Sequence, residues 1–430
     1  MALRMMSFYS FALTCALLLS SPVWGWRMLR QGRYRQGLRE RLGAVSARLT
    51  AFVQSRPVVW VHAVSVGETL AATRLVRELE AALPGHAVVV STTTPTGQQV
   101  ARERFGVDRV FFFPLDFAFA VRAYFRALKP SLVVLMESEL WPRMLVECER
   151  SGVPVAVVNA RVSDRSLPRY MRLRALWKPL LKRISLLLAQ SDEDARRWQQ
   201  IGVPPERVIA AGNLKYDIRV PEASPLVSLL RRHLPADTRV LVCGSTHKGE
   251  ESLLLPCWAS WQGNNRVVLL APRHPERVQE VEDIALTFGL PTLRLSVWRI
   301  SPSRIAPDTV LLVDTVGELS ALYALANVAF VGGSLVPHGG QNPLEPAQFG
   351  VPVVMGPSYE NFRSMVDAMI AARAIRSVTS SNACETLRTL LYTEDDGGLG
   401  KRGRAFAASM SGATRRSVQR LLALLQERAR

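Results

Sequence analysis

Residues 58–83 read VVWVHAVSVGETLAATRLVRELEAAL, a continuous apolar run that passes through a glycine into a helical pattern. The first half has the unbroken, β-branched hydrophobicity of a strand that is covered on both faces. In the second half, apolar residues recur at the spacing of one helix face, at Ala72, Leu75, Val76, Leu79 and Leu83. The stretch therefore predicts a buried strand, a tight turn and a helix, which is the repeating unit of a parallel α/β sheet.

The same alternation continues along the chain in two series. Because 430 residues exceed one compact core, and because the weakly patterned stretch 220–237 contains prolines, we predict two Rossmann-like lobes. They cover residues 57–219 and 238–430, with a linker at 220–237. The further apolar runs are HAVVVSTTT, RVFFFPLD, SLVVLMES, PVAVVNAR and ISLLLAQS in the first series, and RVLVCGS, RVVLLAP, TVLLVDT, NVAFVGG and VPVVMGP in the second.

The N-terminal segment is predicted to be a membrane anchor. No charged residue occurs in the 22 positions between Arg4 and Arg27, and a helix of that length rises about 33 Å, close to the thickness of a bilayer core. Six arginines and one glutamate follow in RMLRQGRYRQGLRER, which places the body of the protein in the cytoplasm by the positive-inside rule. We assign the anchor to residues 1–26 and a basic juxtamembrane segment to 27–56. A cleaved signal peptide is disfavoured by this flank and by the missing A-x-A site.

The composition narrows the classes of partner. With 54 Lys and Arg against 36 Asp and Glu, the formal net charge is +18, which predicts a phosphate ligand, a nucleic acid or an acidic lipid. The five cysteines are widely spaced and form no C-x-x-C pair, so neither a disulfide framework nor a zinc site is expected. No G-x-G-x-x-G follows a first strand and no G-x-x-x-x-G-K-[ST] occurs, which disfavours dinucleotide dehydrogenases and P-loop enzymes.

In the second lobe, the ends of four predicted strands carry glycines, small residues or a cation beside a helix start. Backbone N–H groups at such starts bind phosphate, and glycine allows a ligand to approach the backbone. Arg273 adds a side chain that can hold phosphate with two parallel bonds. We therefore expect a nucleotide held mainly by backbone donors. The four segments are GSTHKGEE (244–251), APRHPER (271–277), DTVGEL (314–319) and VGGSLVPHGGQNPLEPAQFGVPVVMGP (331–357).

Some of these residues also have a purely structural interpretation. The sequence NPLE at 342–345 fits a capping box, with Asn342 at the N-cap and Glu345 at the third helical position. That role does not exclude contact with a ligand. The loop histidines are expected to form hydrogen bonds rather than to bind zinc, because none has a second ligand at metal spacing. Asp192 and Asp194 resemble a D-x-D metal motif, but they follow an apolar run and are assigned to a helix start.

Nine segments, in order and consistently spaced, carry a family resemblance. They are WVHAVSVGETLAA, STTTPTG, LMESELWP, NARVS, GNLKYD, GSTHKGEE, PRHPER, VDTVGEL and FVGGSLVPHGGQNPLEPAQFGVPVVMGP. Together they resemble the bacterial 3-deoxy-D-manno-oct-2-ulosonic acid (Kdo) transferases of lipopolysaccharide synthesis. The resemblance implies an α/β fold of two Rossmann-like lobes, the GT-B glycosyltransferase architecture, with an N-terminal membrane-anchor helix.

The resemblance further implies a reaction. A member of this family is inverting, needs neither metal nor cofactor, and moves Kdo from CMP-Kdo to the 6'-hydroxyl of the tetraacylated lipid A precursor, lipid IVA. It acts at the bacterial inner membrane, with its lobes on the cytoplasmic side, and nucleic acid is not a partner.

Residue roles are implied where the motifs match. Glu68, in SVGE, matches the general base. Glu137, in LMESELWP, and Lys215, in GNLK, match residues that stabilise the transition state. Val316 departs from the methionine expected at its position, which a backbone contact would tolerate. The CMP contacts map to Pro272, Arg273, Val316, Gly317, Glu318, Asn342, Pro343, Leu344 and Glu345.

Two interpretations of Glu68 are open, a catalytic base and a helix cap. As a base, its carboxylate takes the proton of the attacking sugar hydroxyl, and the start of the following helix is expected to keep it ionised. As a cap, it is only a charge in the first turn of that helix. Glu137 is likewise left with two roles, since it can stabilise an oxocarbenium-like transition state or orient Lys215.

Residues 161–183 hold eight Lys or Arg and one Asp, interleaved with large apolar side chains. This pattern suits the headgroup zone of a membrane or an anionic lipid acceptor, and a solvated basic helix is the competing interpretation. Three other functions are alternatives to Kdo transfer. Another membrane-associated GT-B transferase, of the peptidoglycan type that uses a UDP-sugar, would not combine these motifs. A nucleotide-sugar epimerase would need no anchor, and a nucleic-acid binder would show an RNA- or DNA-binding module.

Overall fold

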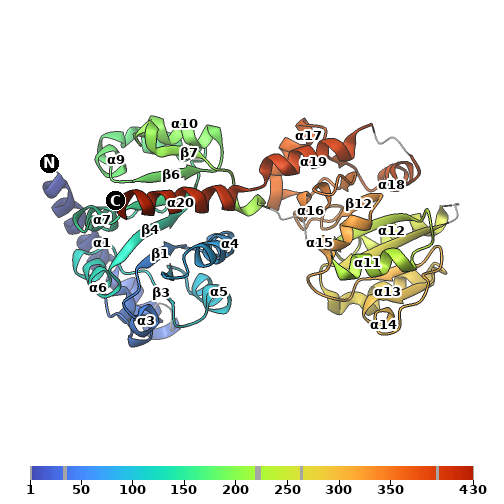
Figure 1. Cartoon of the computed structure of the whole chain (residues 1–430), viewed down its shortest axis with the longest axis horizontal. Coiled ribbons are helices and arrows are strands. Elements are labelled where there is room, and N and C mark those ends of the chain that lie inside the picture. The colour runs from blue at the N-terminus through green and yellow to red at the C-terminus, as the bar shows by residue number, and fades with distance from the viewer. Residues whose placement is uncertain (1, 32–35, 218–223, 262–264, 394–396, 430) are drawn as a thin grey trace. The chain divides into compact units, whose positions relative to one another are not determined.

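The computed structural model describes residues 2–31, 36–217, 224–261, 265–393 and 397–429. They belong to two compact units, one formed by Met1–Asp217 with Gly412–Arg430 and the other by Ile218–Ser411. Each unit is built on a seven-stranded parallel sheet, with helices around it (Figure 1). The predicted pair of α/β lobes is therefore confirmed.

The sheet of the first unit has the strand order β3-β2-β1-β4-β5-β6-β7. Its interior strand β1 pairs with β2 and β4, and Val61 lies opposite Val90 on one side and Val134 on the other. The strands are β1 (Val58–His62), β2 (Ala87–Thr92), β3 (Val110–Phe112), β4 (Pro130–Met136), β5 (Val155–Ala160), β6 (Leu186–Ala189) and β7 (Val208–Ala210). The helices include α3 (Ala47–Val53), α4 (Val66–Ala82), α5 (Pro95–Phe105), α6 (Ala118–Leu128), α7 (Pro142–Arg150), α8 (Leu167–Arg172), α9 (Arg174–Leu181), α10 (Asp192–Ile201), the 3-10 turn η2 (Leu214–Tyr216) and α20 (Ala413–Ala429).

The opening stretch folds as predicted. All five residues of β1 are buried, and alternate side chains enter different cores because successive strand residues face opposite sides of a sheet. Trp60 packs in one core with residues of α6 and α7, whereas Val61 packs in the other with α4. The predicted face of α4 is buried from Ala72 to Leu79.

The second unit has the strand order β10-β11-β9-β8-β12-β13-β14. Its central strand β8 pairs with β9 and β12. The strands are β8 (Arg239–Thr246), β9 (Arg266–Pro272), β10 (Thr292–Arg294), β11 (Val310–Leu312), β12 (Val328–Val331), β13 (Val353–Met355) and β14 (Arg376–Ser377). The helices include α11 (Pro225–His233), α12 (Glu251–Ser260), η3 (Pro275–Arg277), α13 (Val278–Thr287), α14 (Leu295–Trp298), α15 (Leu319–Leu322), η4 (Tyr323–Leu325), α16 (Leu344–Ala347), η5 (Glu360–Phe362), α17 (Arg363–Ala371), α18 (Ala383–Tyr392) and α19 (Leu399–Met410).

The unit boundaries differ from the predicted ones. Residues 412–430 belong to the first unit, because Val418 and Leu421 of α20 pack into the same core as α4; Figure 1 shows this helix in red among the blue and green elements. Part of the predicted linker, 220–223, lies outside the described residues. The rest contains α11, whose Leu226 and Leu230 pack in a core of the second unit.

The basic segment predicted at 27–56 is not a separate region. Helix α3 packs on the first unit, where Leu49 and Val53 are buried. The Glu40 carboxylate, in the short helix α2 (Leu38–Arg41), accepts a hydrogen bond from Phe112 N at 2.8 Å. Arg41 donates to Thr93 O at 2.5 Å. The first unit therefore begins before residue 57.

The N-terminal apolar segment forms helix α1 (Ala2–Gln31). Two polar contacts hold it on the first unit: Tyr9 Oη donates to Asp116 Oδ2 at 2.9 Å, and Arg143 Nη2 donates to Ser10 Oγ at 2.8 Å. Over the described parts of the chain, no helix is both long and apolar enough to cross a membrane. The described residues therefore do not show the anchor predicted for residues 1–26 as a membrane-spanning helix.

The prediction from the cysteines is wrong at one pair. Cys257 of α12 and Cys384 of α18 form a disulfide, with their Cα atoms 5.6 Å apart, while Cys15, Cys148 and Cys243 are free. The two partners are separated by 127 positions in sequence. Sequence spacing does not reveal which cysteines meet in space.

We expect Leu421→Ala to destabilise only the first unit. Leu421 is fully buried, and truncating such a leucine costs about 2–5 kcal/mol. Chemical denaturation of the full chain, followed with probes in each unit, should show an earlier transition for the first unit alone. Gln419→Ala on the exposed side of α20 is the matched control, with an expected effect within about 0.5 kcal/mol. Equal shifts of both units would contradict the assignment of α20.

Candidate functional site

The strand order of the first unit reverses beside β1, and this reversal positions the predicted catalytic residues. In open parallel sheets, ligands bind at the carboxyl ends of the strands where the order reverses. Strand β1 lies between β2 and β4, and the segment after β1 carries Glu68 while the segment after β4 carries Glu137. Two of the three predicted catalytic side chains therefore lie at this point of the sheet.

Glu68 is buried and held by its own turn. Strand β1 ends at His62, so Glu68 is not at the strand end as expected but in the first turn of α4, whose N-cap is Ser65. Its Oε2 accepts from Val64 N at 2.9 Å and its Oε1 from Ser65 Oγ at 2.8 Å. Glu68 N in turn donates to Ser65 Oγ at 3.4 Å. The capping interpretation is thus borne out as geometry.

The capping hydrogen bonds occupy only some of the acceptor positions of the Glu68 carboxylate. A carboxylate has about four acceptor positions, and two of them are used here. Burial raises the pKa of Glu68 above its ordinary value, the hydrogen bonds from Val64 and Ser65 oppose this rise, and the charge of Glu137 adds to it. Burial therefore outweighs these hydrogen bonds, and the raised pKa makes the carboxylate a stronger base than a solvated glutamate.

A second loop fixes the turn that carries Glu68. The amides of Thr93 and Thr94, which follow β2, donate to Val64 O at 3.3 and 3.2 Å. A Cβ atom at Gly97 would lie 2.7 Å from Thr94 Oγ1 and 3.2 Å from Val64 O, so this glycine permits the close approach of α5. Gly67 is exposed instead, which leaves the backbone beside Glu68 accessible to a ligand.

Glu137 and Lys215 form an ion pair. Lys215 Nζ lies 2.8 Å from Glu137 Oε1, and both side chains are partly exposed, at 42% and 26%. Asn213 Oδ1 accepts from Lys215 N, and Asn159 Oδ1 accepts from Leu214 N, each at 2.9 Å. Of the two roles left open for Glu137, orientation of Lys215 is the one that this contact supports.

The backbone of Glu137 is strained. Its φ is 56°, in the left-handed region that residues other than glycine, Asn and Asp rarely adopt. Its amide donates to Val158 O at 2.8 Å, which holds the residue where β4 ends. Strain of this kind at a non-glycine residue clusters at functional sites.

In the second unit, a buried carboxylate joins the two loops at the equivalent reversal of strand order. Strand β8 lies between β9 and β12, and Glu250, in the segment after β8, is fully buried. Its oxygens accept from His247 N (2.9 Å), Gly333 N (2.7 Å), Ser334 N (2.9 Å) and Leu335 N (2.9 Å). At Gly332 a Cβ atom would lie 2.4 Å from Ser245 O, so only glycine fits there.

Next to Glu250, three histidines gather near Arg273. The rings of His247 and His338 stack with centroids 4.3 Å apart, and the His274 ring lies 6.0 Å from His247. Burial, together with the charges of His338, His274 and Arg273, lowers the pKa of His247 to about 4. Gln341 Nε2 lies 3.4 Å from His247 Nε2. All three histidines lie in loops, and the hydrogen bond predicted for them is found at His247.

The remaining predicted CMP residues lie in two further loops of this unit. Pro272 ends β9, and the Arg273 amide donates to Thr246 O at 2.9 Å. Val316 is 85% exposed and Gly317 has a φ of 90°. Glu318 accepts from Arg299 Nη1 at 2.7 Å. Each of the four predicted phosphate-binding segments leads into a helix or a 3-10 turn.

The NPLE motif is capped in part as predicted. Asn342 Oδ1 accepts from Leu344 N at 3.1 Å, but α16 begins at Leu344, with Pro343 as its N-cap. Helix α16 thus begins one residue later than the capping box required. Burial raises the pKa of Glu345, and the nearby Arg273 guanidinium opposes that rise. Glu345 therefore lies close enough to Arg273 for their charges to interact.

Comparison with known proteins identifies the family. Residues 36–218 match the family model described as 3-Deoxy-D-manno-octulosonic-acid transferase (kdotransferase). The 3-deoxy-D-manno-octulosonic acid transferase of Haemophilus influenzae is 34% identical, over 97% of this chain and 98% of that protein. The enzyme of the same name from Bordetella pertussis is 34% identical, over 93% and 95%.

The chain is a member of the Kdo transferase family. It is therefore a glycosyltransferase, and the family supports Kdo transfer in lipopolysaccharide synthesis.

A solved structure agrees with the architecture of this Kdo transferase. UDP-GlcNAc 2-epimerase from Neisseria meningitidis superposes with a TM-score of 0.50 at 12% identity, and the match covers 85% of this chain and all of that one. At this identity the likeness concerns the fold alone.

The sequence missed two residues that the structure places beside the predicted catalytic residues. Glu139 lies in the same motif as Glu137; burial raises its pKa to about 7, and the charges of Glu68 and Glu137 contribute. His62 ends β1, is fully buried, and stacks on Phe113 with centroids 4.0 Å apart. Its Nε2 has no hydrogen-bond partner among the residues described. The sequence pointed to His62 by its position at the end of the strand before Glu68, and to Glu139 by its position in the motif of Glu137.

The helix-start assignment of Asp192 and Asp194 is confirmed. Both lie in the first turn of α10, whose N-cap Ser191 accepts from Asp194 N at 3.1 Å. Asp194 Oδ1 accepts from Val162 N at 2.8 Å. These carboxylates therefore stabilise local structure.

We expect Glu139→Gln to change how stability depends on pH. A carboxyl whose pKa is raised from 4.5 to about 7 in the folded state stabilises the fold below pH 4.5, and this contribution is lost as the pH rises to 7. The glutamine variant does not titrate. Its stability relative to the unchanged protein should therefore increase between pH 5 and 8 in denaturant titrations. A constant difference across this range would show that Glu139 titrates normally.

Proposed function

We propose that this Kdo transferase moves Kdo from CMP-Kdo to the 6'-hydroxyl of the tetraacylated lipid A precursor, with inversion at the anomeric carbon. The observation that carries the proposal is the arrangement at the reversal of strand order in the first unit. There, a buried carboxylate with a raised pKa, Glu68, lies in the electrostatic field of the Glu137–Lys215 ion pair. The family membership supports the sugar that is transferred.

In the proposed reaction, the acceptor hydroxyl oxygen attacks the anomeric carbon of Kdo while the bond from that carbon to the CMP phosphate breaks. The hydroxyl proton passes to Glu68, whose free acceptor positions can receive it. The electron pair of the broken bond leaves with CMP, and positive groups stabilise the departing phosphate. Lys215, oriented by Glu137, is proposed as one such group.

The second unit is proposed to hold CMP. Arg273 can bind a phosphate oxygen pair, and Gly317 exposes backbone beside the ligand. The histidine cluster beside Arg273 carries no ion pair at His247 or His338 within the described residues, and an anion would offset the positive potential that lowers the pKa of His247. A UDP-sugar donor is the alternative. Mass spectrometry of products formed from lipid IVA with CMP-Kdo, or with UDP-sugars, distinguishes the two donors.

We propose that the enzyme attaches to the cytoplasmic face of the inner membrane through α1 and the basic segment 161–183. Leu18 and Leu19 on α1 are 67% and 82% exposed. Met171, Leu173 and Leu176 are exposed beside basic side chains. Exposed apolar and cationic side chains together favour an anionic membrane surface.

Glu68→Gln is expected to lower kcat by about 100-fold or more, because glutamine keeps the size of the side chain but cannot accept the proton. CMP affinity and the thermal midpoint should be nearly unchanged. Ser65→Ala is the matched control, because it removes the capping partner and costs about 1 kcal/mol of stability while leaving the carboxylate. Near-normal kcat in the glutamine variant at saturating donor and acceptor would show that Glu68 acts only as a helix cap.

Charge reversal of Arg172, Arg174 and Lys178, all exposed on α8 and α9, is expected to raise the KM for the lipid acceptor about tenfold and leave CMP affinity unchanged. These residues lie in the lobe that does not carry the CMP motifs, and remote contacts contribute mainly to ground-state binding. An equal reversal at Arg376, Arg388 and Lys401, which are exposed in the second unit, serves as the control. The same KM shift in both variants would show a general charge effect.

The proposed location predicts a result with sealed vesicles. Protease added to inner-membrane vesicles with their cytoplasmic face outward should digest both units, and vesicles of the opposite orientation should protect them. The reason is that the exposed basic side chains are attracted to the anionic lipids of the cytoplasmic leaflet. Protection in the first case would overturn the location.

A further inference from the structure

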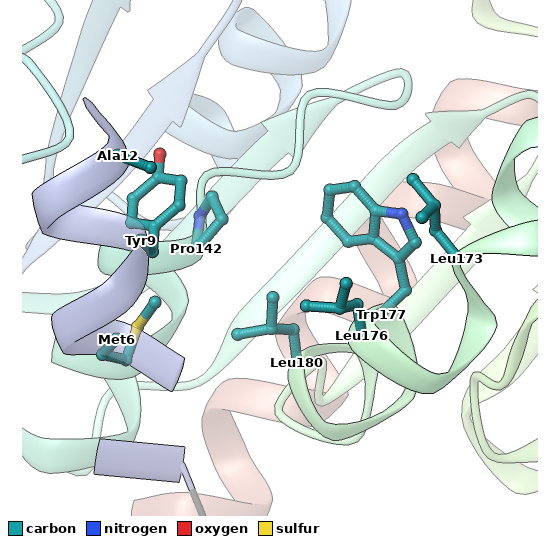
Figure 2. Close-up of a pocket in the computed structure, with 8 residues that line it drawn as sticks. All are labelled: Met6, Tyr9, Ala12, Pro142, Leu173, Leu176, Trp177 and Leu180. Atoms are coloured by element: carbon teal, nitrogen blue, oxygen red, sulfur yellow. The ribbon is translucent and has the colours of Figure 1, made fainter. Parts of the chain in front are cut away.

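An apolar pocket opens between the N-terminal helix and α9. It is lined only by apolar side chains and the ring of Tyr9, and it encloses about 250 Å³. Figure 2 shows the α1 residues on one side and the α9 residues on the other, with Pro142 beside Tyr9. The lining residues are Met6, Tyr9, Ala12, Pro142, Leu173, Leu176, Trp177 and Leu180.

The pocket wall formed by α9 is the apolar face of an amphipathic helix, and other residues bury this face only in part. Leu173, Leu176, Trp177 and Leu180 are spaced i, i+3, i+4 and i+7, which places them on one side of a helix. Leu180 is buried, but Leu173 and Leu176 remain 42% and 53% exposed although they face the pocket. Large apolar side chains that stay exposed around a concave site mark a binding surface for an apolar group.

Basic side chains lie on the two short helices that carry one wall of this pocket. Arg169, Arg172, Arg174 and Lys178 are exposed there, although they do not line the pocket itself. The nearest acidic residue in this segment, Asp164, is paired with Arg197. An apolar cavity beside a cationic surface is complementary to a ligand that has a hydrocarbon chain and an anionic head.

We propose that this pocket binds one fatty acyl chain of the anionic lipid acceptor, so that α1 forms one wall of the acceptor site. The inference rests on the proposed function and adds a specific binding site for one acyl chain. The size agrees, because an apolar cavity of about 150 Å³ already holds benzene, so about 250 Å³ admits a longer hydrocarbon segment.

The pocket is linked to the segment that carries Glu137. Pro142 begins α7, and the amides of Arg143 and Met144 donate to the Asp116 carboxylate at 2.8 and 3.0 Å. The same carboxylate accepts from Tyr9 Oη. A chain in the pocket therefore touches Tyr9 and Pro142, which are both tied to the start of α7, directly after the LMESELWP motif.

Ala12→Trp tests the pocket by filling it from the α1 side. Each buried methylene strengthens binding about fourfold, so expelling two or more should raise the KM for the tetraacylated acceptor at least about tenfold. The kcat/KM for an acyl-free disaccharide acceptor should not change. Phe11→Trp, at a neighbouring residue that is 68% exposed and does not line the pocket, is the matched control. Leu176→Asp, at a half-exposed wall residue, is the second variant in case Ala12→Trp alters folding.

A binding measurement that needs no catalysis separates the pocket from the proposed function. Dodecanoic acid carrying a photoreactive diazirine should label the peptides around Pro142 and residues 173–180 in the unchanged protein and in Phe11→Trp, but not in Ala12→Trp or Leu176→Asp. Labelling of the pocket without any Kdo transfer would support the pocket and overturn the proposed function. Unchanged labelling and KM in the filled variants, or a concentration-dependent dimer that these variants abolish, would overturn the pocket.

Discussion

Reversal of strand order in each parallel sheet is the constraint on which the sites of this Kdo transferase depend. At a reversal, the loops after two adjacent strands turn to opposite faces and leave the strand ends between them uncovered. The first unit has this point between β1 and β4, and the second has it between β8 and β12. In both units a buried glutamate follows a strand at the reversal. Glu68 comes after β1, and Glu250 comes after β8.

The hydrogen bonds of these two glutamates separate their roles. Glu250 accepts four backbone amides, which fills about all the acceptor positions of a carboxylate. It therefore has none left for a substrate and serves to join two loops. Glu68 accepts only two hydrogen bonds, one from the Val64 amide and one from the Ser65 hydroxyl, and shares its surroundings with the charges of Glu137 and Lys215. Its remaining acceptor positions are what a proton acceptor needs, and burial strengthens its basicity.

Local periodicity predicted the strands, the buried face of α4 and the strand ends that carry the predicted phosphate-binding segments, because these depend on neighbouring residues. It also left a capping role open for Glu68, and the structure identifies Ser65 as the partner. The raised pKa of Glu139 could not be predicted, since it depends mainly on burial, with contributions from the neighbouring Glu137 and from Glu68, which is distant in sequence. The Cys257–Cys384 bond and the return of α20 are likewise contacts between distant segments, and neither leaves a periodic signal.

The return of α20 has a consequence for biosynthesis. The chain of the second unit is contiguous, so it can fold as soon as it leaves the ribosome, whereas the first unit must wait for its last segment. Until residues 413–429 are made, the α4 side of its core lacks Val418 and Leu421, and apolar surface stays open to water. Asp217 accepts from the amides of Gly412 and Thr414, both at 2.6 Å, so the final segment closes the first unit at the point where the chain left it. A nascent chain stalled before residue 412 would therefore present chaperones with one completed unit and one unfinished unit.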